Sequence, residues 1–168
     1  MSYINPAPGT AGAVTVKIGV YNGTDATLVS PLSVPALMDI NVKNANDTHV
    51  WSQLDSTAKL VVPTTATNEI TTNIVVDPAT FFGSTLGATT GTAGVLGIMG
   101  LARNKVKIAF EVKVQDLTST TNDYLITGTG YITNLSPAIS ATAPVWVTPM
   151  TIAVTGEYIV ENATGTVS

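Results

Sequence analysis

Few residues of this chain could carry catalytic chemistry. His49 is the only histidine and there is no cysteine, which excludes histidine clusters, thiolate nucleophiles, disulfides and cysteine-based metal sites. No G-x-S-x-G nucleophile elbow is present. We therefore interpret His49 as an interface histidine in a loop, and we predict a protein without catalytic residues, cofactor or metal site.

Glycines and acidic residues do not form ligand-binding motifs either. Gly128 and Gly130 lie inside a predicted strand, and no strand–glycine loop–helix arrangement with a lysine follows them, so phosphate-binding and dinucleotide fingerprints are not supported. Asp39, Asp47 and Asp55 are too widely spaced for a calcium loop. These absences favour a structural or recognition role.

Two groups of residues suit contact with another macromolecule. The polar segment from Asn44 to Thr57 is predicted to be a long loop, and its Trp51 could anchor an interface, because buried aromatic side chains dominate interface energetics. Arg103, Lys105, Lys107 and Lys113 hold over half of the positive charge; they could meet an acidic patch on a neighbouring subunit or form a solvated strand face. The predicted inter-subunit contacts are His49, Val50, Trp51, Leu54, Arg103, Lys105 and Lys107.

The composition suggests a surface that other copies cover. Only 11% of the 168 residues are charged, against roughly 25% in ordinary soluble domains, and the mean hydropathy is +0.34. Some secreted β-proteins share this composition. The net charge of −4 argues against tight nucleic-acid binding, which needs a basic footprint. The first ten residues are polar and no long apolar run follows, so we expect synthesis in a cytosol and no membrane span.

Alternating Val, Ile and Thr residues predict a mainly β protein. Pro63 is expected to stop one strand, Pro149 to mark an edge or a bulge, and Gly128 and Gly130 to allow a bend. Val106, Ile108, Phe110, Val112 and Val114 are expected to share the buried face of the clearest strand. The predicted strands are 14–20, 38–43, 59–62, 70–76, 105–115, 124–133 and 145–160.

Helical structure is predicted between two strands in the middle of the chain. Asp77 and Pro78 form a helix start, with Asp as the cap and Pro at the first helical position. Ala79 to Leu86 is expected to form a turn or two, and a second helical piece, Thr92 to Arg103, to follow despite its glycines. The sequence thus predicts one domain, 1–168, with an N-terminal arm (about 1–12) and a loose C-terminal tail (about 161–168).

This order of elements resembles a known protein family. A strand ending at Val76 leads into the helical region, and Lys105 to Gln115 and then Tyr124 to Thr133 follow. The stretches Gly130-Tyr-Ile-Thr-Asn-Leu135 and Met150-Thr-Ile-Ala-Val-Thr-Gly156 complete the match. The resemblance is to the tail tube proteins of long, non-contractile-tailed phages of the lambda type, and it covers roughly Glu69 to Val160.

The resemblance implies an antiparallel β-sandwich or split barrel with a flanking α-helix. It further implies hexameric rings that stack into a tube in the virion tail, assembled in the host bacterial cytoplasm, through which DNA passes without being held. Tape-measure, tail terminator and distal tail proteins would be partners. Alternatives are a capsid decoration protein, a fibre or Ig-like module, which would lack the helix, and a carbohydrate-binding module. The last would place its aromatic residues on one exposed face: Trp51, Tyr124, Tyr131 and Trp146.

Overall fold

The structure is a computed structural model that describes residues 14–24, 26–34, 37–52, 59–115, 123–142 and 145–162. The expected N-terminal arm, Leu54, most of the predicted 116–123 turn and the tail after Asn162 lie outside these ranges. Glu161 and Asn162, which were expected in the tail, instead end the last strand.

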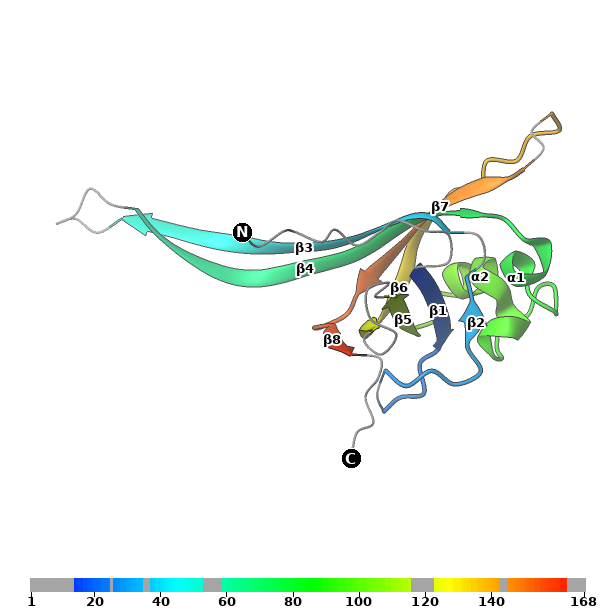
Figure 1. Ribbon diagram of the computed structural model, residues 1–168, viewed down its shortest axis with the longest axis horizontal. Helices are drawn as coiled ribbons and strands as arrows, with labels where there is room; N and C mark the ends of the chain where they lie inside the picture. Colours follow the sequence, from blue (N-terminus) through cyan, green and yellow to red (C-terminus); the bar gives the residue numbers. More distant parts are fainter. Residues whose placement is uncertain are drawn as a thin grey trace, which may run out of the picture.

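The strands form one eight-stranded antiparallel sheet, which confirms the predicted mainly β architecture (Figure 1). The order across the sheet is β2-β1-β5-β6-β7-β4-β3, and β8 pairs with β6 off this path. The bounds are β1 Val14–Val20, β2 Leu32–Ser33, β3 Leu37–Ser52, β4 Lys59–Val75, β5 Ile108–Val114, β6 Tyr124–Leu135, β7 Val147–Val154 and β8 Ile159–Asn162.

Strand β6 has paired neighbours along both of its edges. One edge of β6 pairs with β5 from Tyr124 to Gly130. Its other edge pairs with β8 over the first four residues and with β7 from Gly130 onward. β7 and β8 therefore lie end to end along this edge, and among the described residues β8 has no strand on its outer side.

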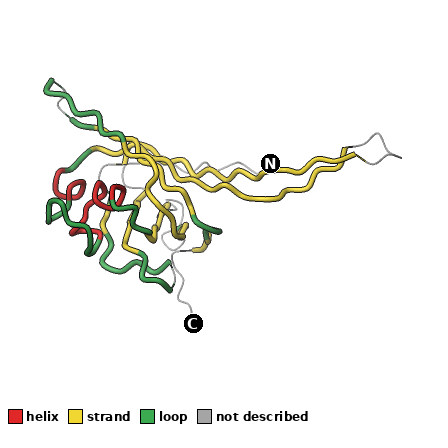
Figure 2. Tube along the Cα trace, turned by 180° about the vertical axis from the view of Figure 1, so that it is seen from behind, coloured by secondary structure: helices red, strands yellow, loops and turns green. Residues whose placement is uncertain are grey.

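Alternation along the strands builds the core. On β5, Ile108, Phe110 and Val112 are buried, as predicted, and they lie opposite the buried residues of β1 through a continuous antiparallel register. Ile132 of β6 and Ile152 of β7 extend the same apolar surface. Two helices cover it on one side, and Figure 2 shows both beside the sheet.

The helical segment begins at the predicted cap and ends at Arg103 as predicted, but its first helix ends at Phe82, before the expected Leu86. Helix α1 spans Pro78–Phe82, and the Asp77 carboxylate accepts a hydrogen bond from the Thr80 backbone N–H at 3.0 Å. Helix α2 spans Ala93–Arg103. Since α1 and α2 are short and α2 is glycine-rich, their stability comes from packing; Phe81, Leu96, Ile98 and Leu101 are all buried.

The two helices meet at a pair of glycines that have no room for a side chain. Gly83 (φ 78°, ψ 173°) and Gly97 (φ 68°, ψ 172°) adopt a backbone conformation that is essentially restricted to glycine, and Gly97 kinks α2. A Cβ atom on Gly97 would lie 2.3 Å from the Gly83 nitrogen. Gly97, which weakens helix propensity in α2, and Gly83 at the end of α1 therefore allow the two helices to cross in contact.

The largest departure from the prediction is a long hairpin. The expected loop from Asn44 to Thr57 is strand as far as Ser52, and the two strands expected at 59–62 and 70–76 are one continuous strand, β4. Pro63 does not stop β4, because it lies beside a register shift, between the pairs Asn46–Ala66 and Thr48–Pro63, on a part of β4 that has no second neighbour.

Two smaller expectations also change. The strand expected at 145–160 is two strands, β7 and β8, which a turn at Gly156 (φ 81°) separates. Pro149 does lie where β7 is locally an edge, since the pairing with β6 ends at Leu135–Met150. The irregularity in β6 falls between Ile132 and Asn134, whereas Gly128 makes room for the ring of Phe110.

Candidate functional site

The hairpin of β3 and β4 projects far from the rest of the molecule (Figure 1). The last pair between β4 and β7 is Glu69–Ala153, so the described residues of β4 from Lys59 to Asn68 have only β3 beside them. At about 3.3 Å per residue, this part of the hairpin is roughly 33 Å long. We call residues 44–52 and 59–68 the arm. Its length approaches the diameter of a compact body of this chain length, roughly 40 Å.

The half of the arm nearest the body, the shaft, is polar. The Lys43 ammonium lies 3.4 Å from a Glu69 carboxylate oxygen at its root. Further out, Thr65 donates a hydrogen bond to the Asp47 side chain at 2.9 Å. The shaft residues opposite each other are small or polar, Asn44 with Asn68, Ala45 with Thr67 and Asn46 with Ala66. Such a segment exposes no large apolar side chain and so has no apolar surface that needs covering.

The outer half of the arm is mainly apolar, although its outermost described pair is Ser52 with Lys59. We call residues Thr48–Trp51 and Leu60–Pro63 the tip. Five of the large apolar side chains that the structure exposes gather here: Val50, Trp51, Leu60, Val61 and Val62, at 40–57% exposure. The tip contains no lysine, arginine or carboxylate. An exposed apolar cluster at the end of a polar shaft is typical of an interaction site.

The register places these side chains on two faces. Trp51 lies opposite Leu60 and His49 opposite Val62, so these four share one face of the ribbon. The His49 and Trp51 rings stack on it with centroids 6.0 Å apart. The pair Val50 and Val61 occupies the other face, next to Thr48 and Pro63.

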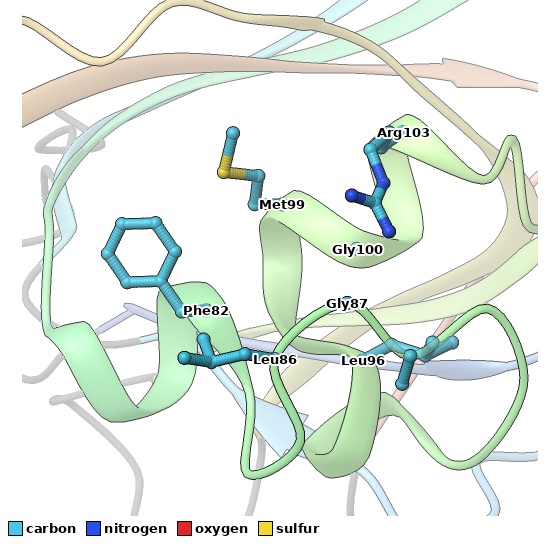
Figure 3. A pocket seen from close by; sticks show the side chains of 8 residues that line it. Phe82, Leu86, Gly87, Leu96, Met99, Gly100 and Arg103 are labelled. Atoms are coloured by element: carbon cyan, nitrogen blue, oxygen red, sulfur yellow. The ribbon is translucent and has the colours of Figure 1, made fainter.

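A second exposed region surrounds the end of α2. Met99 and Arg103, four residues apart on the exposed side of the helix, border two hollows. One hollow, of about 90 Å³, lies between α1 and α2, and Figure 3 shows Phe82, Leu86, Met99 and Arg103 around it. On the other side a wider groove follows β6 and β7. We call this the α2 groove; its two adjoining hollows, of about 290 and 530 Å³, are lined by Met99, Ala102, Arg103, Lys105, Tyr131, Ile132, Thr133, Asn134, Leu135, Ala153, Val154 and Thr155.

The chain leaves α2 through a Schellman turn. The Val106 N–H donates to the Leu101 carbonyl at 3.1 Å, and the Lys105 N–H donates to the Ala102 carbonyl at 3.2 Å. This turn needs a left-handed residue, and Lys105 supplies it with φ 52°. A side chain in this conformation costs stability that glycine would not. The turn thereby holds the exposed Lys105 ammonium at the rim of the α2 groove.

Replacing this lysine is expected to stabilise the subunit. Lys105→Gly removes the left-handed strain, so the free energy of unfolding should rise by about 1 kcal/mol. Urea titration followed by circular dichroism measures it. Lys105→Arg, which keeps both the charge and the strain, should match the wild type. A less stable glycine variant would show that the lysine side chain stabilises the fold.

The predicted basic group does not form one patch. The Lys113 ammonium lies 2.7 Å from an Asp123 carboxylate oxygen, and the Lys107 ammonium lies 4.2 Å above the Tyr21 ring. Arg103 and Lys105 remain exposed at the α2 groove. Within the described ranges, three of the seven cations form ion pairs with carboxylates: Lys17 with Glu111, Lys43 with Glu69, and Lys113 with Asp123.

The predicted contact residues therefore fall into two groups at separate places. His49, Val50 and Trp51 are on the tip, whereas Arg103 ends α2 and Lys105 and Lys107 follow it on the body. Sequence analysis missed the β4 half of the tip, Leu60 to Val62, because a short apolar run before a proline resembles an ordinary core strand. The lack of alternation in that run was the available signal.

The described part of the chain lacks two other features that would indicate a function. No three His, Asp or Glu side chains gather there in a way that could hold a metal ion. None of the helices in the described ranges is long and apolar enough to cross a membrane.

Solved structures with this architecture come from tails and injection tubes. A chain from the tail of an empty gene transfer agent (GTA) particle, a tail with C6 symmetry, matches with a TM-score of 0.63 at 12% identity, covering 92% of this chain and 99% of that chain. The SPP1 tail tube matches with a TM-score of 0.63 at 12% identity, over 92% and 80% of the two chains. The fold is the tail-tube fold.

The tail-tube fold also occurs in a contractile system. A chain of the sheath–tube complex of PVC, an extracellular contractile injection system, matches with a TM-score of 0.55 at 14% identity, over 94% of this chain and 93% of that chain. No family model and no curated protein matches the sequence. The likeness is thus one of architecture, carried by the order of strands and helices more than by individual residues.

The structure argues against two of the alternative classes, a plain Ig-like module and a carbohydrate-binding module. A plain Ig-like module lacks the helices that α1 and α2 supply between β4 and β5. A carbohydrate-binding face is not formed either. Trp51 lies on the tip, Trp146 packs against the core, and Tyr124 and Tyr131 are seven residues apart on β6. The four aromatic residues do not share a platform.

Proposed function

We propose that the chain is a structural subunit, without enzymatic activity, that polymerises as stacked hexameric rings into a phage tail tube. The observation that carries this proposal is the arm, an extended hairpin on a tail-tube fold with an apolar tip that the described residues of its own chain do not cover. A monomer in water would be expected to keep such a surface short and charged. A subunit surrounded by copies of itself can bury it.

Ring closure also accounts for the open strand edges. Among the described residues, β3 has no neighbour on its outer side and β8 pairs only with β6. Unpaired edges invite association, and closing a ring satisfies them without leaving a free edge. The in-plane contact would be head-to-tail, as a cyclic ring requires.

Each of the two groups of predicted contact residues can contact another copy of the chain. Within one chain, the tip and the end of α2 cannot meet, because the arm holds the tip away from the body. Between copies, the tip with His49, Val50 and Trp51 can reach a neighbouring ring or subunit. Arg103, Lys105 and Lys107 remain at the body for a second contact, and Leu54 belongs to the same proposed arm contact.

Conduction of DNA through such a tube would be passive. A net charge of −4 per subunit disfavours retention of phosphates. The ion pairs on the sheet, such as Lys17 with Glu111 at 3.9 Å, balance lysines that would otherwise attract DNA. DNA would therefore slide through the lumen without being bound.

The remaining partners and the location follow from the same proposal. Solved neighbours include a PVC sheath/tube terminator and the tube-terminating cap of the anti-feeding prophage. We infer that this chain meets terminator-type proteins at one end of its tube, a distal tail protein at the other end and a tape-measure protein within. Assembly would take place in the host bacterial cytoplasm, and the tube would become part of the virion tail.

Sedimentation velocity over a range of concentrations tests the proposed function. The wild-type chain is expected to sediment as monomer when dilute and as very large species above a threshold concentration, because stacking of rings is cooperative. Salt should change this little, since the tip is uncharged. A single monomeric boundary at millimolar concentration would count against the proposal.

A further inference from the structure

The tip is apolar on both faces of its ribbon. On one face, Trp51, Leu60 and Val62 surround His49. On the other, Val50 and Val61 lie together, at 48% and 57% exposure. A hairpin that lies along a single surface needs only one apolar face and alternates with polar residues on the other.

Loss of alternation is the pattern of a strand that is buried on both sides. Strands covered on both faces read as continuous apolar runs, as Leu60-Val61-Val62 does here. The shaft of the same hairpin has no such apolar run, since Thr64 to Thr67 are polar or small and exposed. A two-stranded ribbon is also marginally stable on its own in water. The tip is therefore built to be enclosed.

We propose that the tip inserts between two sister copies of this chain, one of which covers each face. This inference rests on the proposed function, and it specifies the stoichiometry of the arm contact, with one arm held by two acceptor subunits. One convex body could cover one face of a projecting ribbon and would leave the other in water. A cleft between two adjacent subunits covers both.

We infer that the two covering molecules are sister copies, because the tip is apolar and each copy exposes apolar surface that could cover it. The eight tip residues carry no Lys, Arg, Asp or Glu, and Asp47 and Lys59 are the charged residues next to them on the described arm, so the tip contact is mainly apolar. Each copy exposes several apolar regions outside the tip, and two of them lie on the body at separate places. One is the α2 groove, with a hollow of about 530 Å³ lined by Tyr131 and Val154. The other is β8, where Ile159 and Val160 are 60% and 61% exposed.

Single-cysteine variants test the inference directly, because the natural chain has no cysteine. Leu60→Cys reports on one face of the tip, Val61→Cys on the other, and Thr67→Cys on the shaft. The rate of thiol alkylation is measured in dilute subunits and in assembled material. We expect both tip thiols to react at least tenfold more slowly after assembly, and the shaft thiol to change less.

Protection of only one tip thiol would overturn the inference and leave the proposed function standing. Failure of the wild-type chain to assemble would overturn both. A second set of variants does not depend on thiol chemistry. Leu60→Lys and Val61→Lys should each raise the threshold concentration for assembly at least tenfold. Ala66→Lys and Thr67→Lys, on the two faces of the shaft, should change it less than about threefold. Circular dichroism of the dilute variants checks that each one folds.

Discussion

A chain with a shortened arm is expected to fold normally and to lose polymerisation. Replacing residues 45–67 by Asn-Gly joins the opposed residues Asn44 and Asn68 through a tight two-residue turn. No buried residue is removed, because the described residues in this range are exposed or, for Ala45, half-exposed. The free energy of unfolding should change by less than about 1 kcal/mol.

The loss of assembly should be large. Complete burial of a Val or Leu side chain is worth roughly 1.5–3 kcal/mol, and the five large apolar tip residues are already about half covered. Burying the remainder would contribute about 4 kcal/mol per arm, which corresponds to roughly a thousandfold in the association constant. Sedimentation velocity of the shortened chain measures the loss, with urea unfolding as the control for folding. Large species from the shortened chain at wild-type concentrations would contradict the role of the arm.

The second large effect is expected at the helix crossing. Gly97→Ala places a methyl group against the Gly83 backbone, at 2.3 Å from its nitrogen, in a conformation that side chains rarely adopt. Backbone strain and steric overlap each cost about 1–3 kcal/mol. The free energy of unfolding should therefore fall by about 3 kcal/mol or more, as measured by urea titration.

Gly94 provides the matched control in the same helix. A Cβ atom there would meet nothing within 4 Å, and alanine has a higher helix propensity than glycine, by about 1 kcal/mol. Gly94→Ala should be as stable as the wild type or more stable. Equal stability of the two alanine variants would mean that α1 and α2 do not cross at Gly83 and Gly97.

The elements of the body could be predicted because they obey local rules. The alternation in Val14–Val20 and Ile108–Val114 reflects strands with one buried face. Asp77 and Pro78 begin a helix because the Asp77 carboxylate accepts a hydrogen bond from one of the free N–H groups, and Pro78 at the first helical position has no N–H that would need a partner. In each case the residues that determine the structure lie next to one another in the sequence.

The arm could not be predicted because its two strands carry residues typical of a loop and of a strand end. Asn44 to Ser52 alternates poorly and is polar, which is typical of a loop, and Pro63 is typical of a strand end. The structure pairs the two segments nonetheless, and a register shift accommodates the proline. Apolar residues at Leu60 to Val62 suggest a core strand when the chain is considered alone, although the body offers them no core.

The α2 groove escaped prediction for a different reason. Its lining comes from α2, β6 and β7, which are up to about fifty residues apart in the sequence, so only the register of β6 with β7 brings them together. The basic residues nearby were recognised by type. Their neighbours were not: Asp123 pairs with Lys113 and Tyr21 lies beneath Lys107, contacts that depend on tertiary structure.

Electron cryomicroscopy of the wild-type chain above its assembly threshold tests the central claim most directly. The prediction is a hollow tube with sixfold end views, in which strands of adjacent subunits lie side by side and each arm tip is enclosed by other copies. Dispersed monomers with the arm free in solvent, at concentrations where stacked rings are expected, would contradict it.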